Sequence, residues 1–242
     1  MSDVVVSCRH VTRVYDEGTV SVHALAGVDF EVHSGEWTSL AGPSGSGKST
    51  LLHVIGGLDR ASSGIVEVDG QRLNELSETE LSDLRLHKIG FVFQAYNLIP
   101  VLTAAENVEF ILQLQGVDAA ERHERARVLL ERLGLGSLGD RRPGELSGGQ
   151  QQRVSLARAI IADPVLLLAD EPSANLDSAT TRELLNLLRQ INEEHNMTMI
   201  TATHDPIVIG YVKRHVMMRD GVIESDEFGS KAPKADGSVA IS

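Results

Sequence analysis

The sequence has a single cysteine, Cys8, among its 242 residues. One cysteine excludes an intramolecular disulfide and a zinc site built from several cysteines, and this composition is typical of a reducing, cytosolic setting. No run of about 18 apolar residues occurs, so we expect no membrane-spanning helix. The N-terminus, MSDVVVSCRHV, lacks the apolar segment of a secretory signal. A role at a membrane would therefore require other chains to hold this protein there.

Basic residues are also scarce. Lys and Arg together number 22 against 34 Asp and Glu, which gives a formal net charge of −12. Nonspecific binding to nucleic acid relies on clustered positive charge, so we expect no nucleic-acid partner. A small anionic ligand is compatible with this charge, because a few backbone N–H groups and one lysine suffice to hold a phosphate.

What the sequence does contain is a succession of strand and helix patterns. Helical spacing of apolar residues over 100–133 predicts a helical insertion at about 95–160. The small, polar residues from Ser225 onward predict a flexible tail over 225–242. We therefore expect one α/β domain over 1–224, with an antiparallel β layer near the N-terminus and an inserted α-helical subdomain.

Two helix starts are predicted from side-chain caps. Ser77 and Glu80 match the capping box and predict a short helix over 78–86. Thr180 and Glu183 match the same pattern ahead of a second apolar stripe.

The segment GPSGSGKST, residues 42–50, matches the phosphate-binding pattern G-x-x-x-x-G-K-[ST]. A predicted strand precedes it and a predicted helix follows, which argues against a Gly-Ser linker. Glycines let backbone N–H groups approach a phosphate, while the lysine reaches the β- and γ-phosphates and the Ser49 hydroxyl coordinates Mg²⁺. The residues predicted to bind ATP here are Gly42, Pro43, Ser44, Gly45, Ser46, Gly47, Lys48, Ser49 and Thr50.

An acid pair ends the apolar run VLLLADEP, residues 165–172, which is predicted to form a buried parallel strand. Asp170 is a candidate Mg²⁺ ligand, directly or through water. Glu171 is the candidate general base for an attacking water. The alternative is that one of them caps a helix or lies at the surface, but Pro172 follows directly and the run before them is fully apolar.

A second glycine motif, LSGGQ at 146–150, precedes a long amphipathic run. It resembles the signature motif of ATP-binding cassette ATPases, in which it binds the γ-phosphate of a nucleotide held by a second copy of the domain. The resemblance covers about 4–224 and implies a P-loop NTPase core, ATP and Mg²⁺ as ligands, and a head-to-tail dimer. Residues implied to contact the partner's nucleotide are Ser147, Gly148, Gly149, Gln150 and Asp177.

Three further positions match family motifs in order. Tyr15 matches the aromatic residue that stacks on adenine, although a lone tyrosine commonly serves packing. Gln94, in FVFQ, matches the glutamine that touches Mg²⁺ and the attacking water. His204, in ATHD, matches the histidine that contacts the γ-phosphate, and SANLD at 173–177 matches the loop that crosses to the partner. The resemblance therefore implies that Glu171, His204 and Gln94 are the catalytic set.

Within the family, several segments look like the lipoprotein-releasing and macrolide-exporter subfamily, which implies integral membrane permease subunits as partners. The stretch AYNLIPVL, 95–102, is predicted to receive a helix of such a subunit, unless its apolar residues pack the protein's own helical lobe. The implied location is the cytoplasmic face of the inner membrane. Trp37-Thr38-Ser39 and Ser173-Ala174 depart from the usual family residues.

Other functions within the family fit less well. Translation factors carry two cassettes in one chain, and repair ATPases separate their phosphate motifs by long coiled coils, whereas here Ser49 and Leu146 are 97 positions apart. A regulatory ATPase of the cell-division type stays open, because it differs from a transport ATPase only in its partner.

Overall fold

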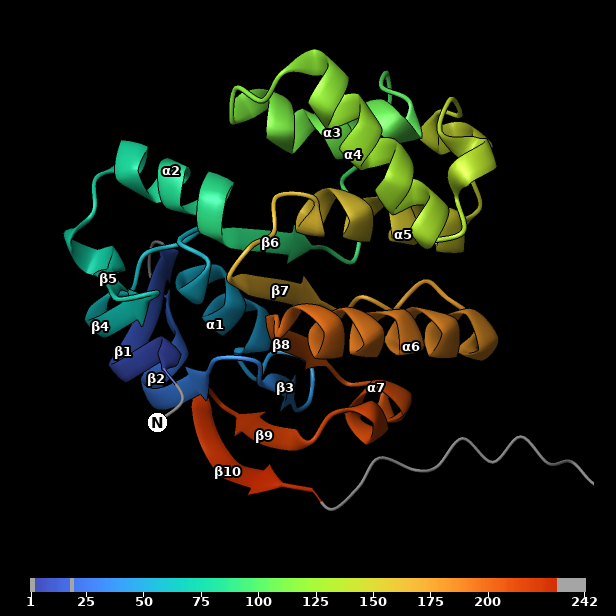
Figure 1. Ribbon diagram of the computed structural model, residues 1–242. Coiled ribbons are helices and arrows are strands. Elements are labelled where there is room, and N and C mark those ends of the chain that lie inside the picture. The colour runs from blue at the N-terminus through green and yellow to red at the C-terminus, as the bar shows by residue number, and fades with distance from the viewer. Residues whose placement is uncertain (1–2, 18–19, 230–242) are drawn as a thin grey trace, which may run out of the picture.

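The computed structural model describes residues 3–17 and 20–229, which fold around two β-sheets (Figure 1). The first sheet is antiparallel and four-stranded, in the order β2-β1-β4-β5. Its strands come from the N-terminal part of the chain, as the sequence predicted. Their bounds are β1 (Val4–Glu17), β2 (Val20–His33), β4 (Ser63–Val68) and β5 (Gln71–Arg72).

The second sheet is six-stranded, in the order β10-β9-β3-β8-β7-β6. All neighbouring pairs are parallel except β9 and β10, which form an antiparallel hairpin. The central strands β3 and β8 are buried on both faces, because helices or the first sheet cover both sides. The bounds are β3 (Trp37–Ala41), β6 (Ile89–Val92), β7 (Leu166–Asp170), β8 (Thr198–Thr203), β9 (Arg214–Arg219) and β10 (Val222–Phe228).

Two apolar cores flank the second sheet. One lies around α1 (Lys48–Ile55), whose Leu51 and Ile55 pack between the two sheets against residues such as Val68 and Ile200. The other lies under α6 (Ser178–His195) and α7 (Pro206–Tyr211), on the opposite face. These cores fix the strand ends that carry the candidate site.

The helical insertion forms a lobe with a core of its own (Figure 1). Val108, Leu112 and Leu130 from its first two helices are fully or almost fully buried against Val154 of the third. The helices of this lobe are α3 (Ala104–Leu114), α4 (Ala119–Arg132) and α5 (Gly148–Ile160), joined by 3₁₀ turns at Gly136–Leu138 and Pro143–Glu145. A further 3₁₀ turn, Leu73–Glu75, and α2 (Glu78–Lys88) lie between β5 and β6.

The local predictions have mixed outcomes. The capping box of Ser77 and Glu80 is confirmed at the start of α2. The predicted cap at Thr180 is wrong, because α6 begins three residues earlier, after Asp177. Strand β10 also runs through Phe228, past the predicted end of the domain at 224, whereas residues 230–242 of the predicted tail lie outside the described residues. No helix in the described part of the chain has the length and apolar character needed to cross a membrane.

Candidate active site

Four neighbouring parallel strands end at one edge of the second sheet, and each leads into a predicted site segment. In sheet order, β3 leads into the loop at 42–47, β8 into His204, β7 into Glu171 and β6 into Gln94. Carboxyl ends of parallel strands meet at the same edge, which is where open α/β sheets bind ligands. The sheet therefore gathers segments that are separated by up to 160 positions in the sequence.

The loop after β3 turns sharply onto the N-terminus of α1. Gly42 has φ +146, and a Cβ there would lie 2.2 Å from the carbonyl oxygen of Met218, so no other residue fits. Gly47, with φ +100, is the N-cap of α1, and among the described residues no side chain accepts from the first N–H groups of that helix. A helix N-terminus with N–H donors available suits an anion, so this geometry is compatible with the phosphate site that the motif predicts.

Lys48 lies beside this loop and is almost buried, with 7% of its surface exposed. Its ammonium nitrogen donates to the carbonyl oxygens of Gly42 and Pro43, each at 2.9 Å. An ammonium carries three N–H donors, so one remains for a phosphate oxygen. The loop's own carbonyls thus hold the lysine in place as a fixed positive charge.

Ser49, in the first turn of α1, and Asp170, at the end of β7, form a hydrogen bond at this edge of the second sheet. The Ser49 hydroxyl donates to a carboxylate oxygen of Asp170 at 2.9 Å, although the residues are 121 positions apart. Burial raises the pKa of Asp170, while the Ser49 hydrogen bond and the nearby positive charge of Lys48 act to lower it. A partly buried carboxylate beside a hydroxyl is a hard oxygen donor set that fits Mg²⁺.

Glu171 follows at the end of β7 in a strained backbone conformation, with φ +47. Its carboxylate is largely buried and accepts from Nδ1 of His204 at 2.7 Å and from the Thr203 hydroxyl at 3.3 Å. An ionised carboxylate only accepts hydrogen bonds, so the His204 proton lies on Nδ1. The imidazole itself is 70% exposed at the sheet edge. This pair is where proton transfer to a carboxylate could take place.

Gln94 lies just beyond β6 with an exposed side chain. Its backbone carbonyl accepts from the side-chain amide of Asn175 at 2.9 Å. Asn175 belongs to the segment between Glu171 and α6, so one side chain connects two of the predicted motifs. Asn175 lies in the SANLD segment, but its contact with Gln94 was not predicted, because the two residues are 81 positions apart and no short pattern links them.

The second glycine motif forms the N-terminus of α5. Ser147 is its N-cap, and the Ser147 hydroxyl accepts from the backbone N–H of Gln150 at 3.3 Å, while the Gln150 side chain accepts from Ser147 N–H at 2.8 Å. Gly149 faces α6 closely, since a Cβ there would lie 2.7 Å from Cγ2 of Thr180. Asp177 caps α6 through the N–H groups of Ala179 and Thr180. These residues thus hold structural roles within the chain besides the ligand roles predicted for them.

A cavity of about 370 Å³ lies at this second motif, between α5 and the start of α6. Its lining includes Ser147, Gly148, Gly149, Gln150 and Asp177, the five residues predicted to reach a partner's nucleotide. It also includes Arg153, which pairs with Glu183. The structure therefore brings the five together in one exposed hollow, separate from the residues that surround Lys48.

Tyr15 lies in the first sheet and is half-buried. Its hydroxyl donates to Asp59 at 2.6 Å, and the Arg13 guanidinium lies over its ring, 4.3 Å from the centroid. Arg13 also pairs with Asp59 at 2.8 Å, and the hydrogen bonds from Tyr15 and Arg13 hold the Asp59 pKa below its usual range against the desolvating effect of burial. Asp59 and Arg13 were not predicted as site residues, because no site motif includes either of them.

Comparison with known proteins adds to this geometry. The profile of the ABC transporter family matches residues 25–174. The chain belongs to the ABC transporter family. An uncharacterized ABC transporter ATP-binding protein from Thermotoga maritima is 50% identical over 217 residues, which cover 90% of this chain and 92% of that protein. This ABC transporter ATPase therefore binds and hydrolyses ATP.

Two further relatives bear on the assembly. The macrolide export ATP-binding/permease protein MacB of Syntrophobacter fumaroxidans is 45% identical over 223 residues, covering 91% of this chain but 31% of that longer protein. The dimeric ATP-binding cassette MJ0796, in a post-hydrolysis state bound to ADP and Pi, matches with a TM-score of 0.87 and 42% identity. That match covers 92% of this chain and 98% of the other.

Proposed function

We propose that this ABC transporter ATPase drives a membrane complex of the lipoprotein-release or macrolide-export type, working as a head-to-tail pair at the cytoplasmic face of the inner membrane. Integral membrane permease subunits would dock onto it. The similarity to MacB supports the subfamily, and the hollow at Ser147, remote from Lys48, supports the pairing. The observation that carries membrane docking is an apolar groove beside Gln94.

For nucleotide binding, we assign the β- and γ-phosphates to the loop at 42–47 and the N-terminus of α1. Lys48 would donate its remaining N–H to a phosphate oxygen. Ser49 and Asp170 would hold Mg²⁺, with Gln94 as a further ligand, and the ion would neutralise charge on the phosphates. Tyr15, fixed by Asp59, would offer one face of its ring to the adenine.

For hydrolysis, Glu171 would accept a proton from the attacking water or orient that water toward the γ-phosphate. The hydrogen bond from His204 fixes the carboxylate, and the exposed imidazole would lie beside the γ-phosphate. Ser147 of a second copy would complete the site: its oxygen lone pair caps α5, so its hydroxyl hydrogen is free to point outward to a phosphate oxygen.

The docking groove measures about 640 Å³ and lies between α2, α3 and the segment after Gln94. Phe91, Phe110 and Leu114 are among its apolar lining residues, and Leu114 is 55% exposed. An exposed apolar surface of this kind marks an interaction site. The occupant proposed is a helix of the permease, with a cell-division type membrane subunit as the second candidate.

The predicted docking stretch 95–102 contributes only in part. Ile99 and Asn97 line the groove, but Leu98 packs against the core of the helical lobe and Tyr96 approaches the second glycine motif, with its hydroxyl near Gly148. A charge at Leu98 would therefore damage the lobe instead of testing docking. The groove floor comes mainly from α2, β6, α3 and α5.

Leu114→Asp tests the docking surface. It should leave ATP hydrolysis and thermal stability of the isolated protein unchanged, while membrane recovery after cell fractionation falls several-fold, because the groove would present a charge to an apolar helix. Val22→Asp is the matched control, since Val22 is 50% exposed on the first sheet, away from the groove. Membrane recovery that is equal for both variants would place docking elsewhere. An integral membrane protein that co-purifies with the control and not with Leu114→Asp would identify the complex.

A further inference from the structure

The turn after Gln94 has an unusual backbone. Tyr96 and Asn97 are consecutive non-glycine residues in the left-handed region, with φ +58 and +51. Within the turn, Tyr96 N–H donates to the carbonyl oxygen of Phe93 at 3.1 Å, and Asn97 N–H donates to that of Ala95 at 2.6 Å. Side chains with a Cβ disfavour this region, so such a turn persists only when neighbouring groups hold it.

Arg158, on α5, is the group that holds it. One guanidinium nitrogen donates to the carbonyl oxygen of Asn97 at 2.6 Å, and another donates to that of Tyr96 at 2.9 Å. The planar fork of an arginine suits two adjacent carbonyls, which a lysine cannot grip in the same way. Burial lowers the Arg158 pKa, and in the described part of the chain its hydrogen bonds go to these two backbone carbonyls.

The same helix is fixed to the strand that leads to Gln94. A Cβ at Gly90 of β6 would lie 2.3 Å from the carbonyl oxygen of Ala159, the residue next to Arg158. Helix α5 thus contacts both the strand before Gln94 and the turn after it. Its other end is the second glycine motif, which begins at Ser147. One rigid helix therefore spans from the predicted partner-nucleotide contact to the Gln94 segment.

Arg158 and Asn97 also line the apolar groove. We propose that Arg158 is a positioning residue that fixes Gln94 at the Mg²⁺ and the attacking water by holding the Tyr96–Asn97 turn. This inference rests on the proposed function, because it takes the role of Gln94 from there.

Arg158→Ala and Arg158→Lys in the full chain test the inference. Both should keep ATP affinity within about twofold, because the groups that hold the phosphates are not touched. Single-turnover hydrolysis should fall about tenfold in Arg158→Ala and less in Arg158→Lys, since a loss of positioning costs rate and not binding. The Mg²⁺ concentration for half-maximal hydrolysis should rise several-fold, which a merely structural role would not produce.

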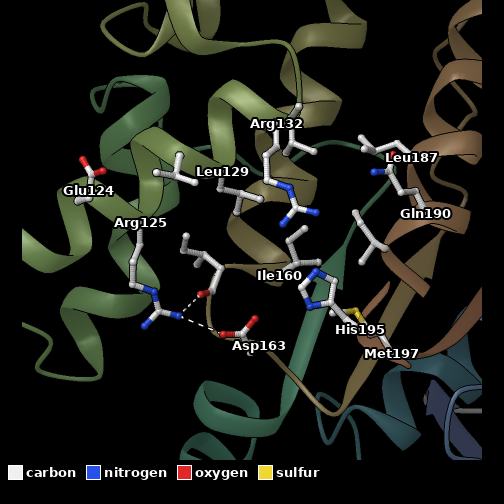
Figure 2. Close-up of a pocket in the computed structure, with 14 residues that line it drawn as sticks. Glu124, Arg125, Leu129, Arg132, Ile160, Asp163, Leu187, Gln190, His195 and Met197 are labelled. Carbon is white, nitrogen blue, oxygen red and sulfur yellow. Dashed lines mark hydrogen bonds and ion pairs between the residues drawn. The ribbon is translucent and has the colours of Figure 1, made fainter. Parts of the chain in front are cut away.

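Arg125 provides the matched control. It also donates from α4 to a backbone carbonyl of the same helix region, that of Ile161 at 2.7 Å, and pairs with Asp163 (Figure 2). It lies in the hollow between α4 and α6, which holds none of the predicted site residues. Arg125→Ala should lower thermal stability by an amount similar to Arg158→Ala, with unchanged hydrolysis and Mg²⁺ dependence.

A rescue separates positioning from folding. Glycine adopts positive φ without strain, so Asn97→Gly should remove the strain at one of the turn's two positive-φ positions, while Tyr96 keeps its own. Adding Asn97→Gly to Arg158→Ala should recover a measurable part of the lost hydrolysis and shift the Mg²⁺ dependence toward that of the wild type. Failure of this rescue, or a normal Mg²⁺ dependence in both Arg158 variants, would overturn the inference.

Gln94→Ala shows which proposal fails. If Gln94→Ala impairs hydrolysis and Mg²⁺ dependence while the Arg158 variants do not, the positioning role is wrong and the proposed function stands. If Gln94→Ala is normal in both, the role proposed for Gln94 is wrong and the positioning role falls with it.

Discussion

The two glycine-rich helix N-termini that are predicted to bind phosphate, those of α1 and α5, are built differently. At α1 the N-cap is Gly47, so no side chain from residues 3–17 or 20–229 caps the helix, and Lys48 in its first turn is buried. At α5 the cap is already supplied by Ser147 and Gln150, and the nearby cation, Arg153, pairs with Glu183. Free N–H donors and a fixed positive charge make the first loop an anion site by itself.

The second loop lacks most of those features. Its cap consumes the Gln150 N–H, and its cation is neutralised, so a free phosphate would gain little there. What remains is the Ser147 hydroxyl hydrogen and the first N–H groups of α5, in an exposed hollow. Such a loop becomes useful when a second chain delivers a phosphate already bound. The difference between the loops is therefore the physical argument for a half-site.

The largest effect is expected from a substitution at Glu171, because this residue is proposed to act in the chemical step. Glu171 belongs to the same sheet edge as the first loop. Glu171→Gln keeps the shape and the His204 contact but loses the charge that accepts the proton of water. ATP affinity should change little, while single-turnover hydrolysis should fall by about two orders of magnitude or more. Near-normal hydrolysis would move the base to another residue, and a large loss of affinity would make Glu171 a binding group.

A smaller effect is expected in the second loop. Ser147→Asp preserves an N-cap, because aspartate caps helices as well as serine does, but it places a negative charge toward the partner's phosphate. Hydrolysis should fall about tenfold to a hundredfold, with unchanged thermal stability and unchanged ATP affinity of the single chain.

Thr103→Asp is the control for that substitution, because Thr103 caps α3 in the same way, through a capping box with Glu106. It should hydrolyse ATP normally. If Ser147→Asp also weakened ATP binding by the single chain, the second loop would belong to the chain's own nucleotide site and the distinction between the loops would collapse.

The smallest effect is expected at Tyr15, which is proposed to stack on the base of the nucleotide. Tyr15→Ala should weaken ATP affinity about fivefold, the range of one aromatic stacking contact. Tyr15→Phe keeps the ring and loses the bond to Asp59, so its affinity should stay within about twofold of the wild type. Isothermal titration of both variants measures this. Equal ATP affinities for the wild type, Tyr15→Ala and Tyr15→Phe would show that Tyr15 does not stack on the base and serves packing only.

Features written in short stretches of sequence were predictable. The strand–loop–helix context of Lys48 and the buried strand before Asp170 follow from local pattern, and the structure has both. The start of α6 was mistaken because aspartate and threonine are both residue types that cap helices, and only Asp177 does so here. The carboxylate of Asp177 accepts two backbone N–H groups and the Thr180 hydroxyl, leaving Thr180 inside the helix.

Contacts between distant segments were not predictable in the same way. Asn175 with Gln94, Arg158 with the Tyr96–Asn97 turn, and Asp59 with Tyr15 join positions 44 to 81 residues apart. No periodicity or cap links such pairs, since the tertiary fold alone brings them together. They are the residues that hold the predicted site in place.

The half-site is tested most directly by the mass of the Glu171→Gln protein in solution. Light scattering after size-exclusion chromatography should give one chain without nucleotide and two chains with ATP and Mg²⁺. Adding Ser147→Asp should return the ATP-bound protein to one chain, while adding Thr103→Asp should not. The division of the active site between two copies would be contradicted if the protein saturated with ATP stayed a single chain. It would also be contradicted if the protein formed pairs without ATP and kept them after Ser147→Asp.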